Sequence, residues 1–404
     1  MTGSRGAEEQ AAPLQGIKVV ELTHMVMGPT AGVILGDLGA DVIKVEPLQG
    51  DNTRRLQGSG AGYFPMYNHN KRSIALDLKH PKGRDVALQL IQSADIVLEN
   101  FRTGTMAKLG LDYESLKTEH PSLIYCSLKG FLSGPYENRV ALDEVTQMMG
   151  GLAYMTGLPD RPLRAGSSVI DITGGMFGVI AILSALHQRR ETGEGSHVTS
   201  ALFETTAFLV GQHMAQQAAS GNAPPPMSVR QSAWAVYDIF ELSSGERLFV
   251  GIVSDTMWQR FCEGFGLTDW AADETLASNA GRVAARENLL PAIRELFAPL
   301  SLAELSERLD RAGLPFSPIN TPGDLFDDPH LIASGGLLPV HLTEGDHAGE
   351  QTKLPRLPVE FGNHKPPLHR DLPKTGADSA EVLQELGLDD EAIAALASEG
   401  VLSG

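Results

Sequence analysis

Apolar positions in the first two hundred residues alternate between short continuous runs and longer stretches with helical spacing. The short runs predict strands at 16–22, 41–45, 73–76, 96–98 and 124–127. Helical spacing lies between them, for example at 83–94, and Pro29 suits the first turn of a helix that follows the first strand. Strands that alternate with helices are typical of βαβ units, so this half of the chain is predicted to form an α/β fold with a parallel sheet.

A long apolar helix is predicted at 172–188, and the basic, glycine-containing sequence RRETGEG ends it. Its most apolar part, 174–186, is rich in glycine and shorter than the ~20 apolar residues that cross a bilayer. We therefore expect a core helix and no association with a membrane.

The composition changes at 220–227, where SGNAPPPM is typical of a linker. Two strand-like segments around the turn sequence SSG then predict a β-hairpin, and helices are predicted at 258–265 and 284–311. This stretch is interpreted as a smaller α+β domain. A short strand at 337–342 and an acidic helix at 389–397 follow it.

The composition is that of a soluble globular protein, with 42% hydrophobic and 20% charged residues over 404 positions. The polar opening lacks the apolar segment of a signal peptide, and the two cysteines, Cys126 and Cys262, do not make a disulfide framework. These features predict a cytoplasmic protein. Neither CxxC nor HExxH spacing occurs, so no metal site is predicted.

The formal net charge of −18 excludes nucleic acid and anionic membranes as partners. A polyanionic ligand would need basic residues concentrated at its own site. The commonest ligand of a βαβ opening is a nicotinamide dinucleotide, which requires glycines at GxGxxG spacing. The turn after the first strand reads HMVMGPTAGVILGDLG, whose glycines do not fit that spacing, so an oxidoreductase is not favoured.

Several ordered blocks together resemble the class III CoA-transferase family, which includes formyl-CoA:oxalate transferase, carnitine-related transferases and α-methylacyl-CoA racemase. The blocks are LQGIKVVELTHMVMGP, LGDLGADVIKVEP, YNHNKRSIALDLKHPKG, DIVLENFRTGTMAKLGL, RAGSSVIDITGGMFGVIAILSALHQRRETGEG and GLPFSPINTPGDLFDDPH. The resemblance covers nearly the whole chain. It implies that the protein binds no permanent cofactor, and that its substrates are a coenzyme A thioester and a small carboxylic acid.

The resemblance also implies a homodimer of two interlocked rings. Each subunit would have a large Rossmann-like domain built from both chain ends, 1–220 and 326–404, and a small inserted α+β domain at 228–325. The linker at 220–227 fits this division. Composition and periodicity by themselves do not indicate the interlocking.

Asp171 matches the nucleophilic aspartate of the family, which attacks a thioester carbonyl and later carries coenzyme A as an aspartyl-CoA thioester. The residues alone favour Asp171 as a helix cap, because aspartate is favoured at an N-cap and two glycines follow, and the match to the family reverses that preference. Gly174 and Gly175 would let backbone amides approach a developing oxyanion, with close helix packing as the alternative.

The resemblance implies a set of residues that contact coenzyme A, with two further basic residues as weaker members. The set is His24, Lys44, Asn100, Phe101, Lys108 and Lys129, and the weaker members are Lys71 and Arg72. Phosphates bind cations or N–H donors, and adenine binds an aromatic face. Taken alone, each lysine is favoured as a solvated surface charge and His24 as a structural histidine; their collection against a net charge of −18 favours a binding site.

Two positions bear on the substrate. Val26 stands where family members that act on oxalate carry glutamine, and the predicted small domain lacks their run of glycines, so oxalate is not favoured. Leu142 stands where the racemases carry a histidine before an aspartate, and leucine cannot move a proton, so a racemase is not favoured. A catalytically silent CoA-binding protein is a third reading.

Blocks of the predicted small domain resemble transferases that use succinyl-CoA and small dicarboxylates, with itaconate, mesaconate, malate and glutarate as candidate acceptors. The second carboxylate of such an acid needs a cation, and arginine binds it bidentately. The candidates are Arg54, Arg55 and Arg164, with Arg230 as a weaker one.

Overall fold

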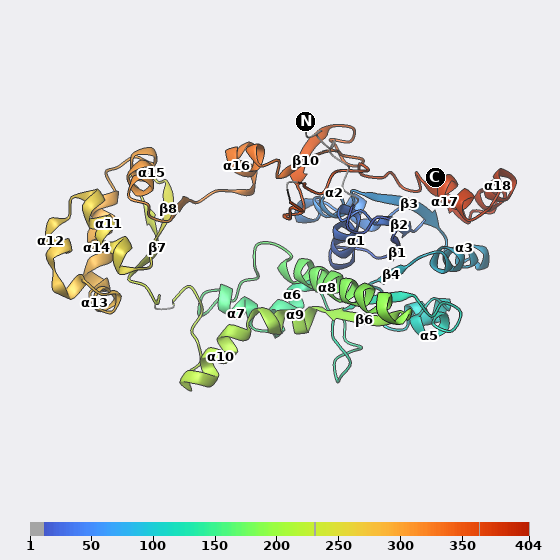
Figure 1. The fold of residues 1–404 in the computed structure, drawn as a ribbon, viewed down its shortest axis with the longest axis horizontal. Coiled ribbons are helices and arrows are strands. Elements are labelled where there is room, and N and C mark those ends of the chain that lie inside the picture. The colour runs from blue at the N-terminus through green and yellow to red at the C-terminus, as the bar shows by residue number, and fades with distance from the viewer. Residues whose placement is uncertain (1–11, 230–231, 363, 404) are drawn as a thin grey trace, which may run out of the picture. The chain divides into compact units, whose positions relative to one another are not determined.

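The structure, a computed structural model, describes residues 12–229, 232–362 and 364–403. The chain forms two compact units (Figure 1). The large unit combines Met1–Val229 with His330–Gly404, and the small unit is Arg230–Pro329. The large unit is thus built from two segments that are far apart in the sequence.

The large unit contains a seven-stranded sheet in the order β12-β3-β2-β1-β4-β5-β6. Its strands are β1 Lys18–Leu22, β2 Asp41–Glu46, β3 Lys71–Leu76, β4 Ile96–Glu99, β5 Ile124–Lys129, β6 Ser196–Ala201 and β12 Leu402–Ser403. All neighbours pair in parallel except β12, which runs antiparallel to β3. The predicted parallel sheet is confirmed; β6 and β12 were not predicted.

Helices cover both faces of this sheet because successive strand residues point to opposite faces. On one face, α3 Pro81–Gln92, α17 Ser379–Glu385 and α18 Asp390–Ser398 enclose a core that contains Val20 and Val45. On the other face, α1 Met27–Asp37 and α8 Val169–Thr192 enclose a core that contains Val19, Val42 and Ile124. Because the strands are buried on both sides, most of their positions are apolar, and the charged residues within them, such as Glu21 and Lys44, are buried as well.

Helix α8 is longer than the predicted 172–188, since it begins at Val169 and ends before Gly193, whose φ is 76°. Within the described part of the chain it is the one helix long and apolar enough to cross a membrane. It packs on β5, β6 and α1, as the core helix of a globular domain does (Figure 1).

Shorter elements complete the large unit. They are α2 Tyr63–Tyr67, α4 Thr105–Leu109, α5 Tyr113–Leu116, α6 Asp143–Met149, α7 Leu152–Thr156, α9 Leu202–Leu209, α10 Gly211–Ser220, the 3-10 turns η1 Asn52–Arg55 and η2 Gly58–Gly60, and the hairpin β10 Leu337–His341 and β11 Gln351–Pro355. In the sequence, helix α16 Pro329–Ala333 spans the point where the small unit ends and the large unit resumes.

The small unit has its own sheet and its own core. Strands β7 Val236–Glu241, β8 Arg247–Ile252 and β9 Phe316–Pro318 form an antiparallel sheet, and the helical elements are α11 Asp255–Phe265, α12 Thr268–Ala272, α13 Asn279–Ala284, α14 Arg286–Phe297, α15 Leu302–Arg311, η3 Glu274–Leu276 and η4 Pro322–Asp327. The core includes Phe240, Trp258 and Phe297. The helix predicted at 284–311 is in fact broken, because Ser301 and Glu304 form a capping box that starts α15.

Candidate functional site

The strand order reverses beside β1, whose neighbours are β2 and β4. In open parallel sheets, ligands bind beyond the carboxyl ends of the strands at such a switch point. His24 follows β1, Asn100 and Phe101 follow β4, and Lys129 is the last residue of β5. Four of the residues predicted to bind coenzyme A therefore lie at one edge of the sheet.

Direct contacts join these residues. The His24 ring stacks on the Phe101 ring, with centroids 5.7 Å apart. The Asn100 side chain accepts a hydrogen bond from the His24 N–H at 3.0 Å and donates one to the His24 carbonyl at 2.8 Å. Lys129 donates to the Phe101 carbonyl at 2.8 Å and pairs with Glu99. Lys108 is exposed on α4, within the connection that follows β4.

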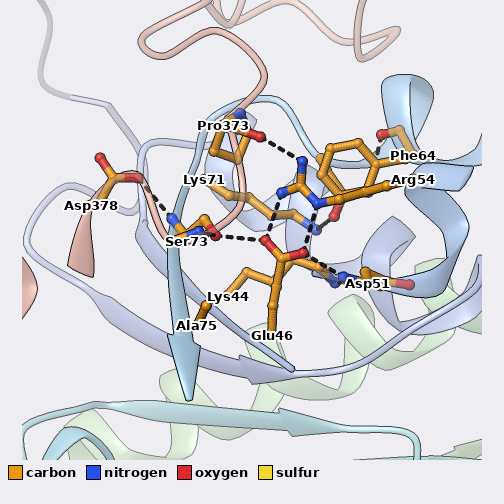
Figure 2. A network of polar contacts seen from close by, with 12 residues as sticks. Lys44, Glu46, Asp51, Arg54, Phe64, Lys71, Ser73, Ala75, Pro373 and Asp378 are labelled. Atoms are coloured by element: carbon orange, nitrogen blue, oxygen red, sulfur yellow. Dashed lines mark hydrogen bonds and ion pairs between the residues drawn. The ribbon is translucent and has the colours of Figure 1, made fainter. Parts of the chain in front are cut away.

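Lys44 and Lys71 lie beneath this edge in a buried polar network, drawn in Figure 2. Lys44 Nζ contacts Glu21 at 3.2 Å and Asp51 at 3.1 Å, and Lys71 Nζ contacts Glu21 at 2.8 Å. Neither lysine side chain has exposed surface. The expectation that they touch the phosphates of coenzyme A does not fit these contacts, because carboxylates already neutralise both ammonium groups.

Burial and neighbouring charge act in opposite directions on the two lysines. Burial lowers the pKa of Lys71 to about 8, because Glu21 opposes the effect only in part. Burial also acts to lower the pKa of Lys44, but Glu21 and Asp51 outweigh it, and the pKa lies above its ordinary value. Lys44 therefore stays charged at neutral pH and secures Glu21 and Asp51.

Arg54 belongs to the same network. Its guanidinium donates twice to Glu46, at 2.8 and 2.6 Å, and once to the Pro373 carbonyl at 2.9 Å, while it lies 3.8 Å over the ring of Phe64 (Figure 2). The predicted contact of Arg54 with an acceptor carboxylate does not fit, because its side chain is fully buried on Glu46. Arg55 is exposed and donates to the Gln49 carbonyl.

Arg72 also differs from its prediction as a weaker coenzyme A residue. Its side chain is buried and pairs with Asp41, Glu381 and Glu385. It lines a cavity of about 1020 Å³ together with Asp41 and Arg370. Because Arg72 pairs with Asp41, the first residue of β2, its side chain lies at the amino ends of the strands and not at the switch-point edge.

Asp171 lies in the first turn of α8, and the residue that caps the N-terminus of α8 comes from another helix. Ser168 is the N-cap residue but makes no capping hydrogen bond through its side chain. Instead, Asp143 of α6 accepts the backbone N–H groups of Ile170 at 2.9 Å and of Asp171 at 3.1 Å. The alternative in which Asp171 is itself the cap is therefore wrong, and its carboxylate is not occupied by capping.

Two groups hold Asp143 in place. Gln147 donates to it at 2.6 Å, and Arg164 lies 3.5 Å away. The amide oxygen of Gln147 also accepts the Ala165 N–H at 2.8 Å, which ties down the segment that leads into α8. Arg164 is about one-third exposed and also approaches Glu144 at 3.8 Å.

The surroundings of Asp171 disfavour its charged form. Burial raises the pKa of Asp171 to about 7, the Asp143 carboxylate adds to the rise, and Arg164 opposes it. The pKa of the neighbouring Tyr67 is raised to about 12 by burial and by the charge of Asp171. A carboxylate that ionises near neutral pH is more basic than an ordinary one, and such a shift is typical of catalytic groups.

Gly174 and Gly175 bring α8 close to α1. A Cβ on Gly174 would lie 2.7 Å from the Met27 Cε, and one on Gly175 would lie 2.6 Å from the Met27 carbonyl oxygen. Close helix packing, the alternative raised from the sequence, thus accounts for both glycines. It sets the N-terminal turns of α8, the first of which carries Asp171, against the start of α1.

The remaining predicted residues flank this arrangement. Val26 is buried at the N-cap of α1, and Leu142 is 58% exposed at the N-cap of α6. Arg230 lies outside the described residues. Asp143, Gln147 and Tyr67 were missed as site residues, although Asp143 follows directly after the singled-out Leu142. Over the described ranges, no group of three or more His, Cys, Asp or Glu side chains could hold a metal ion.

The chain is similar to known proteins over nearly its whole length. The family model described as CoA-transferase family III matches residues 14–379. The succinate–glutarate CoA-transferase of Agrobacterium fabrum is 34% identical over 93% of this chain and 96% of its own. The succinyl-CoA:mesaconate CoA-transferase of Haloarcula hispanica is 31% identical over the same shares. The crystal structure of a CAIB/BAIF family protein from Brucella suis superposes with a TM-score of 0.82 at 37% identity, over 93% of this chain and 100% of that one.

Proposed function

Because the chain belongs to CoA-transferase family III and is therefore a CoA-transferase, we propose that it moves coenzyme A from succinyl-CoA to a small dicarboxylic acid through an aspartyl-CoA intermediate on Asp171. The observation that carries this proposal is the Asp171 carboxylate, which is free of capping, poorly solvated and close to the switch-point edge. Desolvation of a carboxylate nucleophile strengthens its attack on a carbonyl carbon.

The reaction proceeds through two kinds of covalent species. An Asp171 oxygen attacks the thioester carbonyl, the C–S bond breaks, and coenzyme A leaves as the thiolate from a mixed anhydride. The thiolate then attacks the side-chain carbonyl of Asp171, which releases the donor acid and forms the aspartyl-CoA thioester. The acceptor carboxylate attacks that thioester, and the same steps in reverse regenerate the Asp171 carboxylate without net proton transfer.

We assign coenzyme A to the switch-point edge. The stacked rings of His24 and Phe101 offer an aromatic face to adenine, and the exposed Lys108 supplies positive charge for phosphates. Lys129 pairs with Glu99 but is 20% exposed, so it contributes an N–H donor at this edge. Lys44 and Lys71 contribute at a distance, as the buried support of this edge, rather than by contact.

A dicarboxylate acceptor is supported by the names of the relatives, which include glutarate and mesaconate. Within the site, Arg164 is the cation best placed for a second carboxylate, since it lies near Asp171 and is partly exposed. Its contacts to Asp143 and Glu144 are long, at 3.5 and 3.8 Å, and its Nε donates to the Ala165 carbonyl at 3.1 Å. Itaconate, mesaconate, malate and glutarate are the acceptors to test first.

The test has two parts. A screen of acids against succinyl-CoA should show that a C4 or C5 dicarboxylate exceeds the monocarboxylate of equal length by more than tenfold in kcat/KM, a difference of ~1.4 kcal/mol. Equal use of butyrate and succinate would remove the dicarboxylate assignment. Arg164→Gln should reduce the preference and spare any activity with monocarboxylates.

The second part tests the nucleophile. Wild type incubated with acyl-CoA and no acceptor should gain an acyl or CoA mass on the peptide that contains Asp171, and hydroxylamine should trap it. Asp171→Ala should lose transfer and retain binding of coenzyme A. Full turnover by this variant, or an adduct on another residue, contradicts the assignment, and absence of any turnover in wild type would favour a silent CoA-binding protein.

We also propose that the active protein is an interlocked homodimer. Helices α8, α9 and α10 expose large apolar side chains that a monomer would leave in water, namely Met176, Ile180, Phe208 and Met214. Interlocked rings cannot separate without unfolding, so dissociation and denaturation should coincide in sedimentation and circular dichroism experiments. A folded monomer at low protein concentration would contradict this arrangement.

A further inference from the structure

The loop that joins β1 to α1 contains a strained residue. Met25 has a φ of 64°, in the left-handed region that side chains other than glycine rarely adopt. Of the non-glycine residues that the structure describes, Met25 and Asn70 alone have a positive φ. Such strain persists only where the surrounding structure imposes it, and it is concentrated at functional sites.

Side chains from three other strands or strand ends hold this loop. Lys44 donates to the Thr23 carbonyl at 3.0 Å, and Lys71 donates to the Pro29 carbonyl at 3.1 Å. Between these two anchors, the Asn100 amide bonds to both backbone groups of His24, the residue directly before Met25. The loop is thus fixed before, at and after the strained turn.

The two ends of the loop, at Thr23 and Gly28, also lie close together. A Cβ on Gly28 would lie 2.4 Å from the Cβ of Thr23, so the two ends of the loop are in contact. Met27, one residue earlier, packs against Gly174 and Gly175 in the turn of α8 that follows Asp171. A change in the backbone at Met25 would therefore be passed to Met27 and to the position of Asp171.

We propose that Asn100 is a positioning residue for the transfer reaction, which holds the left-handed Met25 turn and thereby sets α1 against the helix that carries Asp171. This role goes beyond a contact with coenzyme A and rests on the proposed chemistry at Asp171. Asn100 already uses one lone pair of its amide oxygen and one N–H on the His24 backbone, so one N–H and one lone pair remain for a ligand.

A double-mutant cycle separates positioning of the Met25 turn by Asn100 from a direct contact between Asn100 and coenzyme A. Met25→Gly removes the steric cause of the strain, because glycine adopts a positive φ readily. If Asn100 serves to hold the strained turn, Asn100→Ala should lower kcat by roughly tenfold in the wild-type background. The same change should cost roughly threefold or less in the Met25→Gly background, because the turn no longer needs to be imposed.

The kinetic constants give a second criterion. Loss of positioning lowers kcat and changes the KM for acyl-CoA by less than about threefold, whereas loss of a ligand contact raises KM. Asn100→Asp, which keeps the acceptor for the His24 N–H and loses the donor to its carbonyl, should fall between wild type and Asn100→Ala. Asn138→Ala, an exposed asparagine bonded only to its neighbour Glu137, is the matched control and should show no coupling to Met25→Gly.

The same four proteins of the cycle are compared by urea unfolding, which requires no substrate. Coupling between the effects of Met25→Gly and Asn100→Ala on the free energy of unfolding tests whether Asn100 holds the Met25 turn, even if the dicarboxylate or Asp171 assignment fails. An equal loss in both backgrounds, or a raised KM with unchanged kcat, would overturn the proposal. Coupling in unfolding without any effect on kcat would also overturn it, since the hold of Asn100 on the Met25 turn would then serve stability alone.

Discussion

Replacement of Asp171 by asparagine should stabilise the protein while it abolishes transfer. Burial and the charge of Asp143 raise the pKa of this carboxyl from 3.8 to about 7. The folded protein therefore holds an ionised group in surroundings that disfavour the charge. Asparagine has nearly the same shape and carries no charge, so it removes this penalty.

The size of the effect follows from the two pKa values. The difference between about 7 and 3.8 is about three pH units, and each unit corresponds to ~1.4 kcal/mol, so the upper limit at pH 8 is ~4 kcal/mol. The side chain is partly reached by solvent, which screens its charge, so about half of that value is expected.

The sign sets a clear pH window. A group whose pKa is raised on folding contributes stability that is fully present below its unfolded pKa of 3.8 and is lost as the pH rises through its folded pKa of about 7. The variant lacks this group, so its advantage should be near zero at pH 3.5, grow between pH 4 and 7, and stay constant above.

The assay is urea unfolding of wild type and Asp171→Asn at pH 5, 6.5 and 8, at one protein concentration. Asp160→Asn, a change of an exposed aspartate before α8, is the matched control and should leave stability nearly unchanged throughout. An Asp171→Asn protein less stable than wild type at pH 8, or an advantage that does not grow with pH, would refute the electrostatic account of the site.

Further expectations concern the charges and packing around Asp171. The acidic limb of the kcat/KM profile is expected near pH 7. Asp143→Asn should move it to lower pH because it removes a negative charge beside Asp171, and Arg164→Gln should move it to higher pH. A limb that moves in neither variant would show that it does not report the ionisation of Asp171. Gly32→Ala should lower the unfolding midpoint strongly, since its Cβ would lie 1.8 Å from a Glu21 oxygen, whereas Gly62→Ala meets open space and serves as control. A chiral 2-methylacyl-CoA in deuterated water should gain no deuterium at a catalytic rate because Leu142 cannot transfer a proton; rapid exchange would instead favour a racemase.

The family and the sheet could be predicted from the sequence because both depend on local patterns. The strands β1 to β5 show as short, mainly apolar runs in the sequence, since both faces of these strands are buried. Strand β6 was missed because its residues alternate between intermediate and exposed positions before the two buried ones at its end. Strand β12 has only two residues, too few for any periodicity.

The site was predicted less well because pairing of side chains is decided by the tertiary structure. Lys44, Lys71 and Arg54 look like surface cations in the sequence, yet their carboxylate partners on β1, β2 and the following loop bury them. Likewise, the role of Asp143 as the cap of α8 depends on two helices that meet in space. A helix that carries aspartate in its first turn gives no sign of where its cap is.

The return of the C-terminal segment to the large unit constrains how the protein is made. Val382, Leu383, Leu396 and Leu402 belong to the same core as Val20 and Ile43, although more than three hundred residues separate the two groups. A ribosome therefore releases the small unit, able to close its own core, while the β3 edge and one face of the large sheet still lack their cover. During that interval the nascent large unit exposes an apolar surface and an unpaired strand, the features that chaperones bind and that lead to aggregation. Truncation before α17 should accordingly give insoluble protein even though every residue assigned here to catalysis or coenzyme A is present.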